Sequence, residues 1–128
     1  MRLLLDTHIV FWAMIDDPRL SAHAKALIDD QRNETFISVV SLWEIALKRA
    51  SKPISTPITL PRARAFLDQA GVRSVSLNPR HVDTYMDLPL RHRDPFDRMI
   101  IAQALEEPLR LVTHDRNVAG YSDSFILI

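Results

Sequence analysis

The stretch Arg2-Leu3-Leu4-Leu5-Asp6-Thr7 decides which fold class the rest of the chain supports. A short apolar run that ends abruptly in a carboxylate and a hydroxyl is typical of a buried parallel strand. In open α/β folds, ligands bind at the carboxyl ends of such strands. Asp6 is therefore the first candidate for a functional residue, because it would emerge at that edge of the sheet.

The composition is that of an ordinary folded domain. The 128 residues are 47% hydrophobic and 25% charged, and the formal net charge is zero. A chain of this length buries about two thirds of the surface that its unfolded form exposes, so we expect a single domain over residues 1–128. Because no net charge attracts an anionic partner, such a partner would have to be held by a local cluster of charges or by metal ions.

Three absences narrow the class of protein. The chain has no cysteine, which excludes disulfides and thiolate metal sites and fits a reducing cytoplasm. It has only two glycines, so it lacks a glycine-rich loop for nucleotide phosphates. No stretch approaches the ~20 apolar residues of a membrane span, and Asp6 interrupts the apolar N-terminal run. We expect a cytoplasmic protein without a membrane partner.

Hydrophobic periodicity and turn signals predict strands that alternate with helices. Besides the first stretch, the runs typical of strands are residues 35–40, 72–77, 109–113 and 124–128. The runs typical of helices are residues 7–14, 22–30, 43–50, 61–70, a segment opened by Asn78-Pro79, and 96–106. The helix at 43–50 is expected to be capped by either Ser38 or Ser41. Strands separated by helices imply βαβ units, right-handed crossovers and a parallel sheet.

Some side chains can be assigned to the core from the same periodicity. In the helix after Asn78-Pro79, the apolar positions expected to face inward are Val82, Tyr85 and Met86. Three aromatic residues in apolar surroundings are also expected in the core, rather than as stacking platforms for bases: Phe11, Trp12 and Trp43.

Four acidic residues fall at junctions between the expected elements, namely Asp6, Glu44, Asp97 and Asp115. Each has a simpler interpretation when it is considered alone. Asp6 is suited to cap the helix that follows it, and Asp97 is favourably placed against a helix dipole. Glu44 has the spacing of a capping box with Ser41. Asp115 could be an ordinary turn residue.

The positions of the four acids relative to the strands favour one shared site at the carboxyl edge of the sheet. Carboxylates that converge raise each other's pKa unless a cation compensates their charge. Oxygen ligands favour hard ions, so we expect Mg²⁺, with Mn²⁺ as a substitute, rather than Zn²⁺. Such an ion activates water and stabilises charge on a phosphoryl group, which favours phosphodiester hydrolysis.

Four motifs of the chain, taken together, are characteristic of a known protein family. They are Leu5-Asp6-Thr7-His8, Ser38-Val39-Val40-Ser41-Leu42-Trp43-Glu44-Ile45, His92-Arg93-Asp94-Pro95-Phe96-Asp97-Arg98-Met99-Ile100-Ile101-Ala102-Gln103-Ala104 and Leu111-Val112-Thr113-His114-Asp115. This set resembles PIN-domain ribonucleases, specifically the VapC toxins of bacterial type II toxin–antitoxin pairs. The resemblance extends over essentially the whole chain.

The resemblance implies a three-layer α/β/α sandwich with a parallel sheet in the strand order 3-2-1-4-5. It also implies Mg²⁺-dependent endonucleolytic cleavage of a transfer or ribosomal RNA, inhibition by a VapB-type antitoxin, and a homodimer. The acids of the family fall on Asp6, Glu44, Asp97 and Asp115, with Asp6 and Asp97 as direct metal ligands. Thr7 and Thr113 match positions that support the site by hydrogen bonding.

Several basic residues near the acids are candidate contacts to RNA phosphates, namely His92, Arg93, Arg98 and Arg116. Arg98 could instead pair with one of the acids, and Arg116 could be a solvated surface residue. The same two interpretations apply to a second basic group, Lys48, Arg49 and Lys52. Phosphate contacts release counterions, so RNA affinity should fall with salt.

Two alternatives to a toxin share the same fold. An RNA-processing nuclease of the PIN superfamily would use the same chemistry without an antitoxin. A catalytically silent PIN-like module would bind RNA or protein, and such a module typically loses one or more of the four acids. A phosphate-accepting receiver-like domain is disfavoured, because it needs a lysine after a late strand, where this chain has Thr113-His114-Asp115-Arg116.

Overall fold

A parallel sheet of five strands forms the middle layer of the computed structural model, which describes all residues from 1 to 128. The strands are β1 (Arg2–Leu5), β2 (Glu34–Ser38), β3 (Arg73–Val75), β4 (Arg110–Thr113) and β5 (Ile126–Leu127). Their order in the sheet is β3-β2-β1-β4-β5, and all four pairings are parallel. The predicted α/β class and strand order are therefore confirmed, with β1 in the centre.

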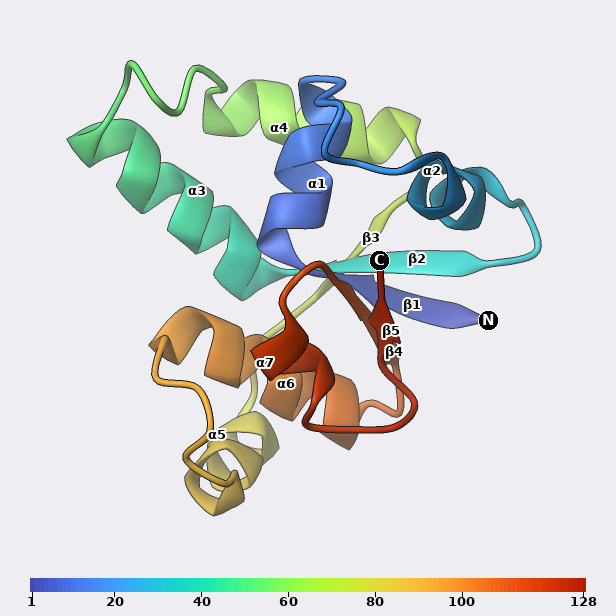
Figure 1. Ribbon diagram of the computed structural model, residues 1–128. Coiled ribbons are helices and arrows are strands. Elements are labelled where there is room, and N and C mark those ends of the chain that lie inside the picture. Colours follow the sequence, from blue (N-terminus) through green and yellow to red (C-terminus); the bar gives the residue numbers. More distant parts are fainter.

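Helices cover both faces of the sheet. They are α1 (Thr7–Met14), α2 (Ala22–Asp29), α3 (Val39–Ser51), α4 (Leu60–Gln69), α5 (Pro79–Asp87), α6 (Pro95–Glu106) and α7 (Arg116–Ala119). The helices α1, α2 and α4 lie on one side of the sheet, and α5, α6 and α7 lie on the other (Figure 1). The longest helix, α3, has 13 residues, and no helix is long and apolar enough to cross a bilayer.

Alternation along the central strand divides the core into two parts. Leu3 and Leu5 belong to the cluster beneath α1, α2 and α4, whereas Leu4 belongs to the cluster beneath α6 and α7. Leu4 is paired with Phe36 on one side and Leu111 on the other, and both of these side chains join its cluster. Because both faces of β1 are buried, its apolar run ends only where the sheet ends, at Asp6.

The junction between β2 and α3 differs from the sequence-based prediction. The strand ends at Ser38, and the helix already begins at Val39. The Ser38 hydroxyl is the N-cap, because it accepts a hydrogen bond from the amide of Val40 at 2.9 Å. Ser41 is therefore inside the helix, and the capping box between Ser41 and Glu44 does not form. The side chain of Glu44 is left available for another role.

The inward face of α5 was predicted wrongly at two of its three positions, because only Tyr85 is half-buried. Val82 and Met86 are 45% and 75% exposed, whereas His81 is fully buried. The imidazole of His81 accepts a hydrogen bond from the amide of Asn78 and lies 2.9 Å from a carboxylate oxygen of Glu107 at the end of α6. The helix thus docks through a polar contact, which apolar periodicity cannot reveal.

Trp43 is also placed differently from the prediction, because its side chain is 59% exposed. The buried positions of α3 are Val40, Ser41, Glu44 and Ile45, so residue 43 points away from the sheet. Its indole packs against the ring of Phe96, with centroids 5.0 Å apart. Trp12, by contrast, is 6% exposed and belongs to the core, as predicted.

Candidate metal centre

Two of the predicted acids follow neighbouring strands at the same edge of the sheet. Asp6 directly follows β1 and is 4% exposed, and Asp115 follows β4. The buried hydroxyl of Thr113 connects the two acids, because it donates to Asp6 Oδ2 at 2.7 Å and accepts from the Asp115 amide at 3.1 Å. The amide of Thr7 donates to Asp6 Oδ1 at 2.8 Å. Both acids are also N-caps, which was the simpler interpretation of Asp6 but not of Asp115, expected as a turn residue.

Glu44 is carried inward by α3 and is 3% exposed. One of its carboxylate oxygens, Oε2, lies 3.0 Å from the ammonium group of Lys48, one turn further along the helix. The other oxygen, Oε1, is buried without any hydrogen-bond partner. A buried carboxylate oxygen is costly when nothing compensates it. This orphaned oxygen fits a site that receives a cation or its bound water.

Asp97 lies in the first turn of α6, which Asp94 caps. Burial, followed by the charge of Asp6, raises the pKa of Asp97 to about 6, and the charges of Asp94 and Glu44 act in the same direction. A hydrogen bond from His92 opposes this shift. Asp97 is therefore within electrostatic range of the two acids on β1 and α3, as the topology predicted.

Burial also raises the pKa of Asp6, even though hydrogen bonds from Thr113 and Thr7 favour its ionised form. The negative charge of Glu44 adds to the increase. Two carboxyl groups with raised pKa at one sheet edge indicate a shortage of positive charge, which a divalent cation would supply. The residues present therefore fit the hard cation that the sequence predicted.

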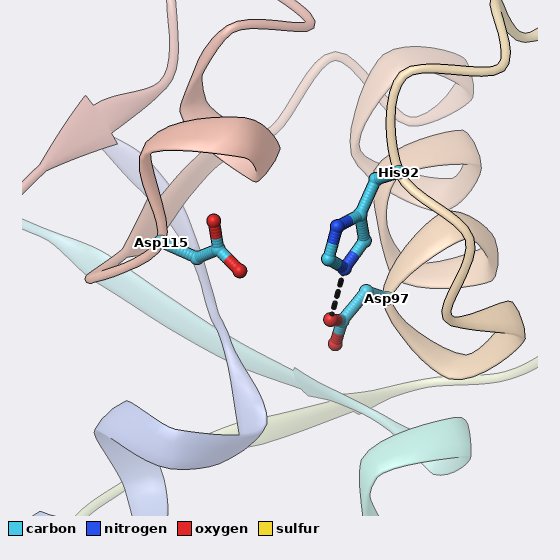
Figure 2. A group of neighbouring side chains, drawn as sticks. All are labelled: His92, Asp97 and Asp115. Atoms are coloured by element: carbon cyan, nitrogen blue, oxygen red, sulfur yellow. Dashed lines mark hydrogen bonds and ion pairs between the residues drawn. The ribbon is translucent and has the colours of Figure 1, made fainter.

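His92 completes a group of three side chains that point toward one space (Figure 2). Its Nε2 atom lies 2.7 Å from Asp97 Oδ2. One ligand atom from each of His92, Asp97 and Asp115 lies within 4.8 Å of the others. The loop before α6 thus contributes a nitrogen atom to a site that was predicted from carboxylates alone.

Two depressions of the surface meet beside the acids. The first is lined by Asp6, His8, Trp12, His114, Asp115 and Arg116. The second shares His8 and Trp12 with the first and extends between α1 and the end of α3. Its basic residues are Arg19, Lys48 and Lys52. The guanidinium of Arg19 lies over the Trp12 ring, 4.9 Å from the centroid. A basic cleft therefore leads to the acidic edge.

The candidate RNA contacts are distributed unevenly. Arg116 lines the first depression, and Arg93 is exposed in the loop before α6. Both interpretations of Arg98 are contradicted, because it is 7% exposed and pairs with no acid. Its guanidinium donates instead to the backbone carbonyls of Tyr85, Pro89 and His92. The position of Arg98 next to Asp97 in the sequence did not indicate these contacts, because consecutive residues of a helix point in different directions.

Three contacts at the site were missed from the sequence. Lys48 pairs with Glu44 at the spacing of i to i+4, which could have been noticed once a helix was expected there. The hydroxyl groups of Thr7 and Ser41 lie 2.7 Å apart and join α1 to α3, so Thr7 supports the site through its side chain as well. The approach of His92 to Asp97 depends on how the loop folds back, and no sequence pattern indicates it.

The sheet order and the acids at its carboxyl edge define a class of protein, and comparisons with known proteins identify it. A family model of the PIN domain matches residues 3–123, so the chain belongs to the PIN-domain family. The identification made from the sequence motifs is thereby confirmed.

Among curated proteins, the chain is similar to Ribonuclease VapC22 of Mycobacterium tuberculosis (strain ATCC 25618 / H37Rv). The two are 32% identical over 122 residues, which cover 93% of this chain and 91% of the relative. The fold is similar to that in the crystal structure of VapBC2 from Rickettsia felis bound to a promoter DNA fragment. That match has a TM-score of 0.75 at 19% identity and covers 100% of this chain and 98% of the other. DNA-bound VapBC from Salmonella typhimurium matches with a TM-score of 0.68 at 15% identity, covering 100% and 97%.

Proposed function

We propose that this protein is a Mg²⁺-dependent endoribonuclease, in which Mn²⁺ can replace Mg²⁺, and that it is the toxin of a VapBC-type pair in the cytoplasm. Membership of the PIN family and the similarity to a VapC ribonuclease support this proposal. The observation that carries it is that acids from four separate elements lie at one sheet edge. Ligand atoms of Asp97 and Asp115 lie within 4.8 Å of each other, and the charges of Asp6 and Glu44 raise the pKa of Asp97. One of the four acids, Glu44, has a buried oxygen without a partner. A silent module would have no reason to keep this costly arrangement.

The four acids would divide the work of holding the cation. Asp6 and Asp97 would be direct ligands, while Glu44 and Asp115 would complete the shell through water or hold a second ion. When bound, the cation supplies activation of water and stabilisation of charge at phosphorus. Thr113 orients the Asp6 carboxylate by its hydrogen bond. Such hydrogen bonds matter because they orient a ligand toward the metal, and metal affinity falls when they are removed.

RNA would approach through the basic cleft between α1 and α3. Lys48 and Lys52 line that cleft, and Arg19 lies at its wall. A chain with zero net charge offers no general attraction to a polyanion, so local cations must supply it. Arg93 and Arg116, which are exposed beside the acids, are suited to further phosphate contacts. We propose a transfer or ribosomal RNA as the substrate.

The test of this function is cleavage of total cellular RNA by the purified chain in Mg²⁺ and in EDTA. We expect cleavage only with Mg²⁺, with 5′-phosphate and 3′-hydroxyl ends, because water rather than the 2′-hydroxyl is the nucleophile. Asp6→Asn should abolish cleavage, whereas Asp68→Asn, an exposed acid on α4, should not change it. Cyclic phosphate ends in EDTA, or full activity of Asp6→Asn, would overturn the proposal.

A VapB-type antitoxin and a second copy of the chain are the proposed protein partners. A mostly apolar groove between α1, α2 and α4 is suited to an antitoxin helix, and its lining includes Val10, Leu20, Ile28, Phe66 and Leu67. The exposed face of α3 offers apolar residues at every fourth position for a dimer: Val39, Trp43 and Leu47. Co-purification with the product of a small upstream reading frame, with loss of RNA cleavage, tests the antitoxin. An RNA-processing nuclease would have no such neighbour.

A further inference from the structure

The imidazole of His92 lies beside the proposed acidic metal ligands but has no role yet in the site. Its Nε2 atom lies 2.7 Å from Asp97 Oδ2, and both side chains are mostly buried, at 17% and 14% exposure. Asp115, at the start of α7, points into the same space from the direction opposite to His92 and Asp97 (Figure 2). Three ligand atoms from separate parts of the chain thus lie within 4.8 Å of one another.

These separations match a shared coordination shell. With metal–ligand bonds of about 2.1 Å in an octahedral site, neighbouring ligand atoms lie about 3 Å apart and opposite ones about 4.2 Å apart. The distance between His92 and Asp97 corresponds to neighbouring positions in such a shell. No separation in the group is greater than 4.8 Å, so small side-chain rotations would bring all three atoms into one shell.

The backbone holds His92 in this position. Its amide donates to the hydroxyl of Tyr121 at 3.0 Å, and its carbonyl accepts from the guanidinium of Arg98 at 3.3 Å. The Tyr121 hydroxyl in turn donates to the carbonyl of Pro89 at 2.7 Å. The loop is therefore fastened to α6 and to the segment after α7. A fixed imidazole beside a carboxylate is what a preformed metal site requires.

A second observation at the same edge points to a ligand. Glu44, which α3 carries inward, is 3% exposed, and its Oε1 atom is buried without a partner. Lys48 contacts only the other oxygen of that carboxylate. Neither the helix caps nor the hydrogen bonds of the neighbouring acids satisfy this oxygen, so a cation at this sheet edge, or water bound to it, would supply the missing partner.

We propose that His92 is a nitrogen ligand to the cation that Asp97 binds and whose shell Asp115 completes, and that it makes the site bind Mn²⁺ more tightly than Mg²⁺. This inference rests on the cation site of the proposed function. Mg²⁺ strongly prefers oxygen ligands, whereas imidazole nitrogen binds transition-metal ions. For Nε2 to act as a ligand, the ring proton must sit on Nδ1. His92 is then part of the metal site and does not bind RNA phosphates.

The experiment uses the full chain without RNA, with Mn²⁺ or Mg²⁺ alone as the probe. Pulsed electron paramagnetic resonance of bound Mn²⁺ detects a directly coordinated ¹⁴N nucleus. We expect this signal in the wild type, its loss in His92→Gln, and its retention in His114→Gln. His114 is a matched control, because it lines the depression beside Asp115 but hydrogen-bonds to the Ile128 carbonyl. The dissociation constant for Mn²⁺ should rise about tenfold in His92→Gln, and that for Mg²⁺ much less.

The possible results distinguish coordination by His92 from the proposed nuclease function. A nitrogen signal that survives in His92→Gln, or that disappears only in His114→Gln, overturns the inference, as does an equal loss of affinity for Mn²⁺ and Mg²⁺. A wild type that binds Mn²⁺ without any nitrogen signal overturns it while leaving the proposed nuclease intact. A wild type that binds neither ion overturns both. If His92→Gln fails to fold, the wild type labelled with ¹⁵N only in histidine still tests histidine coordination.

Discussion

One hydroxyl group at the end of β4 sets the geometry of two acids. Thr113 is fully buried, donates to the carboxylate of Asp6 and accepts from the amide of Asp115. Its position at the last residue of the strand explains both contacts, since β1 and β4 are neighbours in the sheet. A single side chain therefore couples the first strand to the fourth at the candidate site.

Replacing this hydroxyl tests its role in holding the metal ligands. Thr113→Val keeps the shape of the side chain but removes the donor to Asp6. We expect divalent-cation affinity and RNA cleavage to fall about 10- to 100-fold, as for other groups that orient metal ligands. Thr113→Ser keeps the donor and should retain most of both. Isothermal titration with Mn²⁺ measures the affinity, and equal behaviour of the two variants would contradict this role.

The pKa of Asp97 predicts how stability depends on pH. Burial and the charge of Asp6 raise this pKa from the ordinary value of 3.8 to about 6. The folded chain then binds the proton more tightly than the unfolded chain, so the free energy of unfolding should fall as the pH rises through this interval. In EDTA, Asp97→Asn should raise that free energy on the order of 1–2 kcal/mol at pH 7 and very little at pH 4.

Urea unfolding of the wild type and the variant at several pH values measures this effect. Mg²⁺ should act in the opposite direction, because it binds the ionised carboxylate and stabilises the wild type increasingly above a pH of about 6. A difference between wild type and Asp97→Asn that stays constant from pH 4 to pH 7 would contradict the raised pKa.

At the scale of elements, a polar clamp fixes the loop between α5 and α6. Arg98 reaches back from α6 to the carbonyls of Tyr85, Pro89 and His92. The Tyr121 hydroxyl, from the segment after α7, contacts Arg98 and the amide of His92 as well. The buried guanidinium thus satisfies carbonyl groups that would otherwise lack donors. The clamp positions the residues that precede Asp97.

Removing one hydroxyl from this clamp should have a measurable cost. Tyr121→Phe deletes the donor to the Pro89 carbonyl and the acceptor for Arg98, so we expect it to lower the free energy of unfolding by about 1–3 kcal/mol. Tyr85→Phe is the control, because the contact between its ring and the Arg98 guanidinium, at 4.9 Å, is kept. Denaturant titration compares the two. Equal stability of both variants would show that the clamp does not support the loop.

The elements also show which features the sequence could predict. Acids that follow buried strands, such as Asp6 and Asp115, are placed correctly, because strand ends in a parallel sheet share one edge. The outward face of Trp43 could not be predicted, because it depends on which side of α3 meets the sheet. The approach of His92 to Asp97 also depends on tertiary contacts, here those of Arg98 with the loop. The strand order came from the resemblance to a family rather than from the residues themselves.

At the scale of the whole molecule, charge is balanced but unevenly distributed. The chain has 16 basic and 16 acidic residues, yet three basic residues line the cleft that meets the acidic edge. Binding of the proposed RNA substrate would therefore depend on a few local contacts and should weaken with salt. Two of the three basic residues are already paired with acids, Arg19 with Asp17 and Lys48 with Glu44, whereas the exposed Lys52 has no ion pair and can be changed without disturbing one.

We expect Lys52→Ala to weaken binding of an RNA oligonucleotide in EDTA and to reduce the salt dependence by about one unit of log–log slope. Lys25→Ala is the matched control, because Lys25 lies outside the cleft in a surface ion pair with Asp16 and should not change RNA binding. Fluorescence anisotropy at several salt concentrations measures both. Equal slopes for Lys52→Ala and the wild type would exclude the cleft as the path of the RNA.

The central claim is that acids carried by separate elements form one divalent-cation site. Anomalous diffraction at the manganese edge, from crystals grown with Mn²⁺, tests it most directly. We predict a peak within about 2.5 Å of carboxylate oxygens of both Asp6 and Asp97. A cation bound elsewhere, or Asp6 and Asp97 too far apart to share one, would contradict the claim.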